Sequence, residues 1–110
     1  MGRQLGYRQR AASPNTEKVS FSVDAALDIV RLRQFLQPVA SGAAKSAVSA
    51  IIRGCLSLAV FPARGSLRRD GSRQLIIGFG ASAYVARYRI DPDEDEVVIL
   101  RICHGREAEP

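Results

Sequence analysis

The residues best suited to chemistry lie near the end of the chain. His104 is the only histidine, and Arg101 and Arg106 stand within three positions of it. An imidazole can take a proton from a ribose 2′-hydroxyl while guanidinium groups stabilise the phosphorane that forms. The trio therefore admits acid–base chemistry on a phosphodiester. A second interpretation stays open, in which His104 is hydrogen-bonded at a strand end and performs no chemistry.

Arginine carries almost all of the positive charge. The chain has fourteen arginines against two lysines and a net charge of +5. Six of these arginines fall between Pro62 and Arg89, with Asp70 as the single acid among them. Guanidinium groups bind phosphate and carboxylate in a planar, bidentate way. This segment therefore predicts a surface for a polyanion or an acidic partner protein, the alternative being a solvated sheet face.

The patterns typical of metal sites are incomplete. Asp91, Asp93 and Asp95 have the spacing of a calcium loop, but Glu96 stands where glycine is needed and Ile102 where a bidentate glutamate is needed. One histidine without suitably spaced partners does not make a zinc site. No metal ion is expected.

A glycine pair at Gly78 and Gly80 is the only trace of a nucleotide-binding motif. A strand pattern follows it rather than the start of a helix, so no pyrophosphate site is presented. No cofactor is expected.

Three extended runs position the chemical residues: Gln74–Phe79, Ala83–Ile90 and Val97–Cys103. The middle run alternates apolar and arginine positions, as a half-buried strand does. Glycine in the first connection and a proline–aspartate sequence in the second are typical of hairpin turns. We expect an antiparallel three-stranded meander, with its arginines on the outward side or at the margins.

The front half predicts one strand and two helices. Val19–Val23 alternates as a strand, and Asp24 is expected to cap a helix that continues to Leu36. The apolar stripe of this helix comprises Ala25, Ile29, Leu32, Phe35 and Leu36. A second helix should begin near Ser41 and end at Pro62. Helices that precede an antiparallel meander indicate an α+β domain, with the first strand at a sheet edge or beside the last strand.

Composition and length limit the remaining possibilities. A chain of 110 residues forms one domain, and no apolar run reaches the length of a membrane span. Cys55 and Cys103 are expected to be buried free thiols, as in a cytoplasmic protein. Met1–Lys18 has no periodicity and is expected to be a disordered basic arm or an upstream extension. Gly54 within the second helix predicts a close backbone contact or a slight bend.

Residues 19–107 resemble the ParE/RelE superfamily of toxins from type II toxin–antitoxin systems, also called plasmid stabilisation proteins. The resemblance rests on Arg73 before a strand, Gly80 in the hairpin, the Tyr88–Arg89 pair, and the final segment Val98–Arg106. An Ala-x-x-Asp-Ile segment at Ala25–Ile29 agrees with the first helix of that superfamily. The resemblance implies a bacterial toxin of β-α-α-β-β-β topology.

Two branches of the superfamily imply different activities. ParE-like members poison DNA gyrase without catalysis, and this branch is favoured because the arginine-rich loop before the first strand of the meander lacks a lysine cluster and a glutamate. RelE-like members are ribosome-dependent mRNA endoribonucleases; in that case His104 would be the base, and Arg73 with Arg87 would hold phosphate. A degenerate member that only binds its antitoxin is the third possibility.

The resemblance also implies a cognate antitoxin and a hetero-oligomeric complex in the cytoplasm. We expect an antitoxin helix in a groove where the alanine-rich second helix meets the sheet, and an acidic stretch that crosses the arginines. The expected antitoxin contacts are Arg73, Arg87, Arg89 and Ala47. The expected target or nucleic-acid contacts are Arg73, Arg87, Arg89, Arg101, His104 and Arg106.

Overall fold

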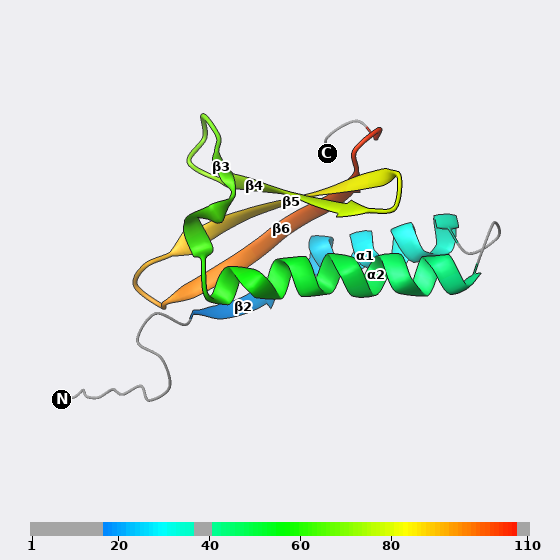
Figure 1. Ribbon diagram of the computed structural model, residues 1–110. Helices are drawn as coiled ribbons and strands as arrows, with labels where there is room; N and C mark the ends of the chain where they lie inside the picture. The colour runs from blue at the N-terminus through cyan, green and yellow to red at the C-terminus, as the bar shows by residue number, and fades with distance from the viewer. Residues whose placement is uncertain (1–16, 37–40, 108–110) are drawn as a thin grey trace.

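A computed structural model describes residues 17–36 and 41–107, and Figure 1 traces their arrangement. Most of the arm predicted at Met1–Lys18 therefore lies outside the described residues. Its last residue, Lys18, already belongs to the first strand.

One sheet holds all the strands of the described residues. The strands are β2 (Lys18–Phe21), β3 (Ser66–Leu67), β4 (Arg73–Phe79), β5 (Ser82–Asp91) and β6 (Glu96–His104), and their order in the sheet is β2-β6-β5-β4-β3. The predicted antiparallel meander is confirmed as β4, β5 and β6. The first strand lies at an edge of the sheet and pairs in parallel with the last one, which confirms both expected positions. The α+β class is confirmed.

Helices α1 (Val23–Leu36) and α2 (Ser41–Leu56) lie side by side on one face of the sheet and leave the other face uncovered (Figure 1). Their buried side chains meet those of alternate strand positions, including Tyr84, Tyr88 and Ile99. This burial supplies the core of the domain. The uncovered face keeps the outward side chains of the meander accessible.

The start of α1 differs from the prediction. The strand ends at Phe21, and Ser22, rather than Asp24, caps the helix: its hydroxyl oxygen accepts a hydrogen bond from the Ala25 amide at 3.0 Å. Phe35, which was placed on the apolar stripe of this helix, does not face the core, because it is 70% exposed. The helical hairpin extends past the end of the sheet, so the last turn of α1 has no strand beneath it (Figure 1).

The second helix begins at Ser41, as predicted, but it is shorter than expected. It ends at Leu56, and two 3₁₀ turns, η1 (Ser57–Ala59) and η2 (Pro62–Arg64), carry the chain to the sheet. Gly54 confirms the predicted close contact, since a Cβ atom there would lie 2.8 Å from Cδ1 of Ile77. The absence of a side chain lets α2 pack directly on β4.

Both cysteines are buried thiols outside any disulfide, as predicted. Burial raises the pKa of the Cys55 thiol to about 12. A thiol with so high a pKa is protonated at neutral pH and is a poor nucleophile. Cys55 therefore has a packing role in the core.

Candidate functional site on the meander

The outward face of the meander carries Arg87 and Arg89. Both are on β5, where Tyr84, Ala86 and Tyr88 are buried beneath the helices and the positions between them face away. Arg89 is exposed and lies 4.0 Å from the carboxylate of Asp91, a surface ion pair of small energetic value. These two guanidinium groups are therefore available to a partner.

Asp70, in the loop before β4, is an acid whose charge interacts with that of Arg87. Its carboxylate accepts hydrogen bonds from the Ser72 hydroxyl at 2.6 Å and the Ser72 amide at 2.9 Å. These bonds lower the pKa of Asp70, and the positive charges of Arg68 and Arg87 act in the same direction. Arg87 itself is partly exposed.

Arg73 does not belong to the same patch. In the register of β4 and β5 it pairs with the buried Tyr88, whereas its neighbour Gln74 pairs with Arg87. Cross-strand partners share a face, so Arg73 and Arg87 point to opposite sides of the sheet. The Arg73 guanidinium donates to the carbonyl of Gly65 at 2.8 Å and fastens the loop before β4. Arg73 was predicted to form one patch with Arg87 and Arg89, but the sheet separates it from them.

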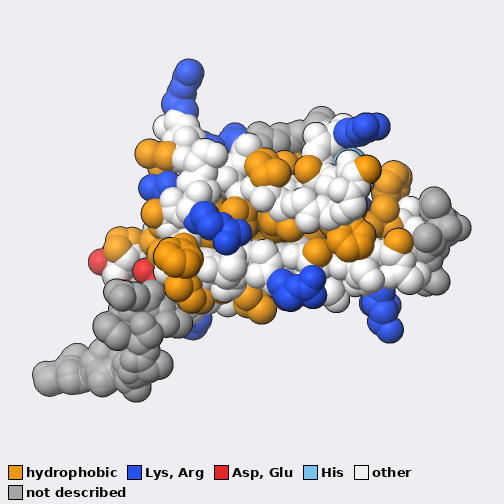
Figure 2. Space-filling model, viewed as in Figure 1, with side chains coloured by type: hydrophobic (Ala, Val, Ile, Leu, Met, Phe, Trp, Pro, Cys, Tyr) orange, Lys and Arg blue, Asp and Glu red, His pale blue; other side chains and the backbone are white. Residues whose placement is uncertain are grey.

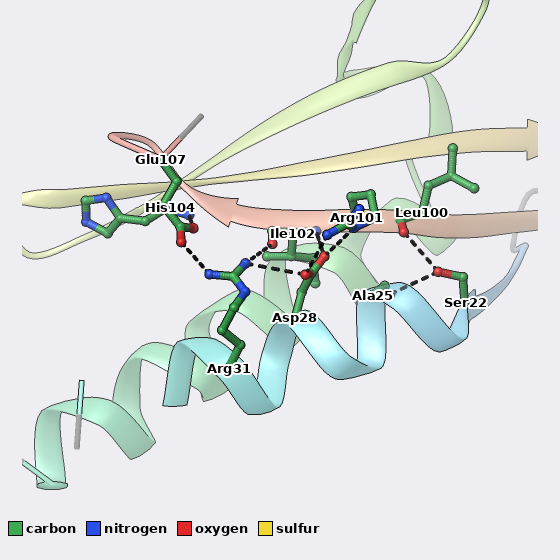
Figure 3. A network of polar contacts seen from close by, with 9 residues as sticks. All are labelled: Ser22, Ala25, Asp28, Arg31, Leu100, Arg101, Ile102, His104 and Glu107. Atoms are coloured by element: carbon green, nitrogen blue, oxygen red, sulfur yellow. Dashed lines mark hydrogen bonds and ion pairs between the residues drawn. The ribbon is translucent and has the colours of Figure 1, made fainter. Parts of the chain in front are cut away.

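Arg101 pairs with Arg87 across the strands, yet its guanidinium turns to α1 (Figure 3). Its Nε donates to Oδ2 of Asp28 at 2.8 Å, and a second nitrogen donates to Oδ1 at 3.1 Å. Asp28 is only 3% exposed and also accepts the Ile102 amide at 2.8 Å. Arg101 is therefore committed to a buried ion pair that ties α1 to β6.

The pKa of Asp28 reflects two opposed effects. Burial alone would raise it, but the hydrogen bonds from Arg101 and from the Ile102 amide outweigh burial and lower the pKa of this carboxyl. Sequence reasoning missed this residue. The available signal was an acid on the apolar stripe of α1, three positions after Ala25 and four before Leu32.

The remaining polar groups of the β6 edge are satisfied by side chains near Asp28 (Figure 3). Strand β2 ends opposite Ile99, and beyond that point no strand formed by residues 17–36 or 41–107 lies beside the edge of β6. There the Ser22 hydroxyl donates to the Leu100 carbonyl at 2.9 Å, and Arg31 donates to the Ile102 carbonyl at 3.1 Å. Arg31 also pairs with Glu107, whose other oxygen accepts the His104 amide at 2.7 Å. We call the contacts that Ser22, Asp28 and Arg31 make with β6 the α1–β6 junction.

His104 lies at the end of β6, on the side of the sheet opposite Arg87. It pairs with the buried Tyr84, and the two rings meet edge to face with centroids 5.2 Å apart. Its Nδ1 accepts the Arg106 amide at 3.1 Å, so the neutral ring carries its proton on Nε2. A cavity of about 420 Å³ opens beside the ring, and it is lined by Ala81, Ser82, Ala83, His104, Gly105 and Arg106.

The predicted site residues therefore occupy three separate places. Arg87 and Arg89 lie on the outward face, His104 and Arg106 border the cavity at the strand end, and Arg73 with Arg101 holds the fold together. Ala47 is 1% exposed and packs in the core, so its side chain is not accessible to a partner.

In the part of the chain that the structure describes, no group of three or more His, Cys, Asp or Glu side chains could hold a metal ion. Within the same residues, no helix is long and apolar enough to cross a membrane.

Residues 19–109 match the family of ParE toxins from type II toxin–antitoxin systems (parDE). The chain belongs to this family. It is 35% identical over 91 residues to Toxin RelE3 of Caulobacter vibrioides, which covers 83% of this chain and 97% of that protein.

Two solved structures share the fold. One is the chromosomal ParDE toxin–antitoxin system of P. aeruginosa, with a TM-score of 0.68, 21% identity, and coverage of 82% of this chain and 97% of the other. The second is the toxin–antitoxin complex RelBE2 of Mycobacterium tuberculosis, with a TM-score of 0.58, 24% identity, and coverage of 86% and 98%. The type II toxin assignment drawn from the sequence is confirmed.

Proposed function

We propose that this toxin acts without catalysis: it binds DNA gyrase in the cytoplasm, traps its DNA-cleavage complex, and is neutralised by a cognate antitoxin. The observation that supports this proposal is the separation of the candidate catalytic residues. His104 and Arg87 lie on opposite sides of the sheet, so they would not hold one scissile phosphate between them. Arg87 and Arg89 on the uncovered face offer the contact surface instead.

The state of His104 supports the same proposal. A general base needs an unprotonated nitrogen directed at the proton it removes. The nitrogen of His104 that lacks a proton is Nδ1, and it is occupied by the Arg106 amide. The nitrogen left for a substrate is then a donor, which suits hydrogen bonding better than proton abstraction.

Gyrase assays test the proposal directly. Purified toxin, freed of antitoxin, should inhibit supercoiling or accumulate cleaved plasmid. Replacing Arg87 and Arg89 together with Ser should reduce this activity by tenfold or more, on the order of the loss when two interfacial charge contacts are removed. The matched control replaces Arg33 and Arg64, which are exposed elsewhere, and should keep full activity. No effect of the unaltered toxin on gyrase at micromolar concentration would refute the proposal.

The alternative is a RelE-like ribosome-dependent mRNA endoribonuclease. The cavity of about 420 Å³ beside His104 and Arg106 favours it, since a nucleotide could enter there. A translation extract separates the two functions: codon-phased mRNA cleavage that is lost in His104→Gln would establish the nuclease. Harmless overexpression, with neither gyrase inhibition nor mRNA cleavage, would indicate a protein that only binds its antitoxin.

We also propose that the antitoxin forms a hetero-oligomer with this toxin and crosses the outward face at Arg87 and Arg89. Arg73 does not contact the antitoxin in this proposal. Its guanidinium donates to the Gly65 carbonyl and so holds the loop before β4 in place. We leave Ala47 out of the proposed surface because it is buried. Replacing Arg87 and Arg89 with Ser should weaken the complex and flatten its salt dependence, since fewer ion pairs remain to be screened. Unchanged affinity and salt dependence would place the antitoxin elsewhere.

A further inference from the structure

Helix α2 presents a row of polar and basic residues to solvent. The groove along this row has a volume of about 330 Å³ and is lined by Gly42, Lys45, Ser46, Ser49, Arg53 and Phe79. With 3.6 residues per turn, the lining residues that belong to α2 fall within a sector of about 100° on one side of the helix. All of them are exposed. Lys45 and Arg53 are separated by about 12 Å along the helix axis.

Among the described residues, no acid pairs with the two cations of this row. Helix α2 contains no aspartate or glutamate. None of the ion pairs within residues 17–36 and 41–107 involves Lys45 or Arg53, whereas Arg89 on the uncovered face of the sheet pairs with Asp91. Figure 2 shows Lys and Arg side chains along α2, and Asp and Glu only at one end of the visible surface. The row therefore has a positive potential that attracts an anion.

The side chains between the two cations favour phosphate as that anion. Proteins contact the DNA backbone through Lys and Arg side chains and through hydroxyl, amide and backbone N–H donors. Ser46 and Ser49 place such hydroxyls between Lys45 and Arg53. Because a helix fixes the spacing of its side chains, the row suits the regularly spaced phosphates of a duplex better than a flexible anion.

An acidic peptide or a second copy of the chain would gain less at this row. The backbone N–H and C=O groups within a helix bond to one another, so the middle of α2 offers an extended peptide no main-chain hydrogen bonds. A second copy would bring its own Lys45 and Arg53 against the same cations, which repel. A phosphate backbone needs only cations and hydroxyl donors, and the row supplies both.

We propose that Lys45, Ser49 and Arg53 bind the phosphate backbone of duplex DNA. The gyrase cleavage complex presents such DNA beside protein, and to that extent the site rests on the proposed function. Helix α2 covers one face of the sheet, whereas Arg87 and Arg89 lie on the uncovered face (Figure 1). The toxin can therefore contact gyrase through these arginines and the DNA through α2 at the same time.

Binding of a labelled duplex to the full toxin, freed of antitoxin, tests the site. A duplex of about 20 base pairs should bind with an affinity that falls steeply between about 50 and 200 mM salt. Replacing Lys45 and Arg53 together with Gln, which preserves helix propensity, should weaken binding about tenfold at the lower salt concentration. The slope of log affinity against log salt should become shallower by about 1.8, since two phosphate contacts are lost. Fluorescence anisotropy measures both quantities, and circular dichroism verifies the fold.

Two matched variants separate the row from net charge. Arg33→Gln with Arg69→Gln removes the same charge from exposed positions outside the groove and should change affinity by less than about twofold. Lys45→Arg with Arg53→Lys keeps both charges and should keep both affinity and slope. Equal losses in the two Gln variants, or no binding by the unaltered toxin, would overturn the proposal. So would a Lys45→Gln, Arg53→Gln variant that binds DNA normally but loses the antitoxin, because the row would then serve an acidic protein.

A gyrase assay keeps this result apart from that of the proposed function. The Lys45→Gln, Arg53→Gln variant should need about tenfold more protein than the unaltered toxin to accumulate cleaved plasmid. If the toxin leaves gyrase unaffected but binds the duplex through Lys45 and Arg53, the proposed function fails and the DNA site stands. If the toxin poisons gyrase but the duplex does not bind, the DNA site is overturned and the proposed function stands.

Discussion

Arg87 and Arg101 are paired across β5 and β6, yet their side chains have different roles. Arg101 donates two hydrogen bonds to a buried carboxylate on α1, whereas Arg87 stays partly exposed on the uncovered face. A guanidinium bound to a buried carboxylate is costly to release, because the carboxylate left behind is unpaired. An exposed guanidinium has little to lose when a partner binds it. The first arginine therefore stabilises the domain, and the second is available for recognition.

This difference lies in the α1–β6 junction rather than in residue type. Where β2 stops beside β6, the described residues add no further strand. Side chains of Ser22, Asp28 and Arg31 satisfy the exposed backbone instead. The junction thus closes one sheet edge with side chains. The opposite edge, at Leu75–Phe79, has no such closure among the described residues.

The largest expected effect is that of Asp28→Asn. The amide removes the charge that balances Arg101, and it weakens the bond to the Ile102 amide. We expect a loss of about 3–5 kcal/mol in the free energy of unfolding, as for other broken buried pairs. Urea denaturation measures it. Asp24→Asn, an exposed substitution on the same helix, should change stability by less than about 0.5 kcal/mol. Similar losses in both variants would contradict the role of the junction.

Tyr88→Phe comes next. The buried hydroxyl accepts the Gly65 amide at 2.8 Å and donates to the Pro62 carbonyl at 2.7 Å. Its removal leaves both backbone groups without that partner and should cost about 1–3 kcal/mol. Thermal unfolding followed by circular dichroism provides the measurement. A melting temperature equal to that of the unaltered protein would show that water replaces the hydroxyl.

A smaller effect is expected on acidification. The pKa of Asp28 is lower in the folded state than its ordinary value of 3.8, so its stabilisation is complete above that ordinary value and is lost as pH falls through the folded pKa. The stability difference between the unaltered protein and Asp28→Asn should therefore shrink as pH falls below about 4. Denaturation at a series of pH values down to 2.5 tests this. A constant difference would mean that Asp28 does not titrate in this range.

Most of the fold could be predicted from the sequence because local patterns specify it. Alternation in β5, the apolar run of β6 and the turn residues between them are short-range signals. Pairing of Arg101 with Asp28 joins residues 73 positions apart, and no local pattern encodes which guanidinium meets which carboxylate. For the same reason the candidate arginines looked like one patch in the sequence, although the register of β4 and β5 places Arg73 on the opposite face from Arg87.

The smallest effect on stability should come from the double variant Arg87→Ser with Arg89→Ser. Neither side chain is buried, and the contact of Arg89 with Asp91 at 4.0 Å contributes little. We expect the free energy of unfolding to change by less than about 0.5 kcal/mol. Arg101→Ser removes a single arginine, but it should cost several times more because Asp28 stays buried without its ion pair. Comparing the two variants in urea separates recognition from folding. If the double variant destabilises the domain as much as Arg101→Ser does, the outward arginines are structural, and the surface proposed for gyrase and antitoxin must lie elsewhere.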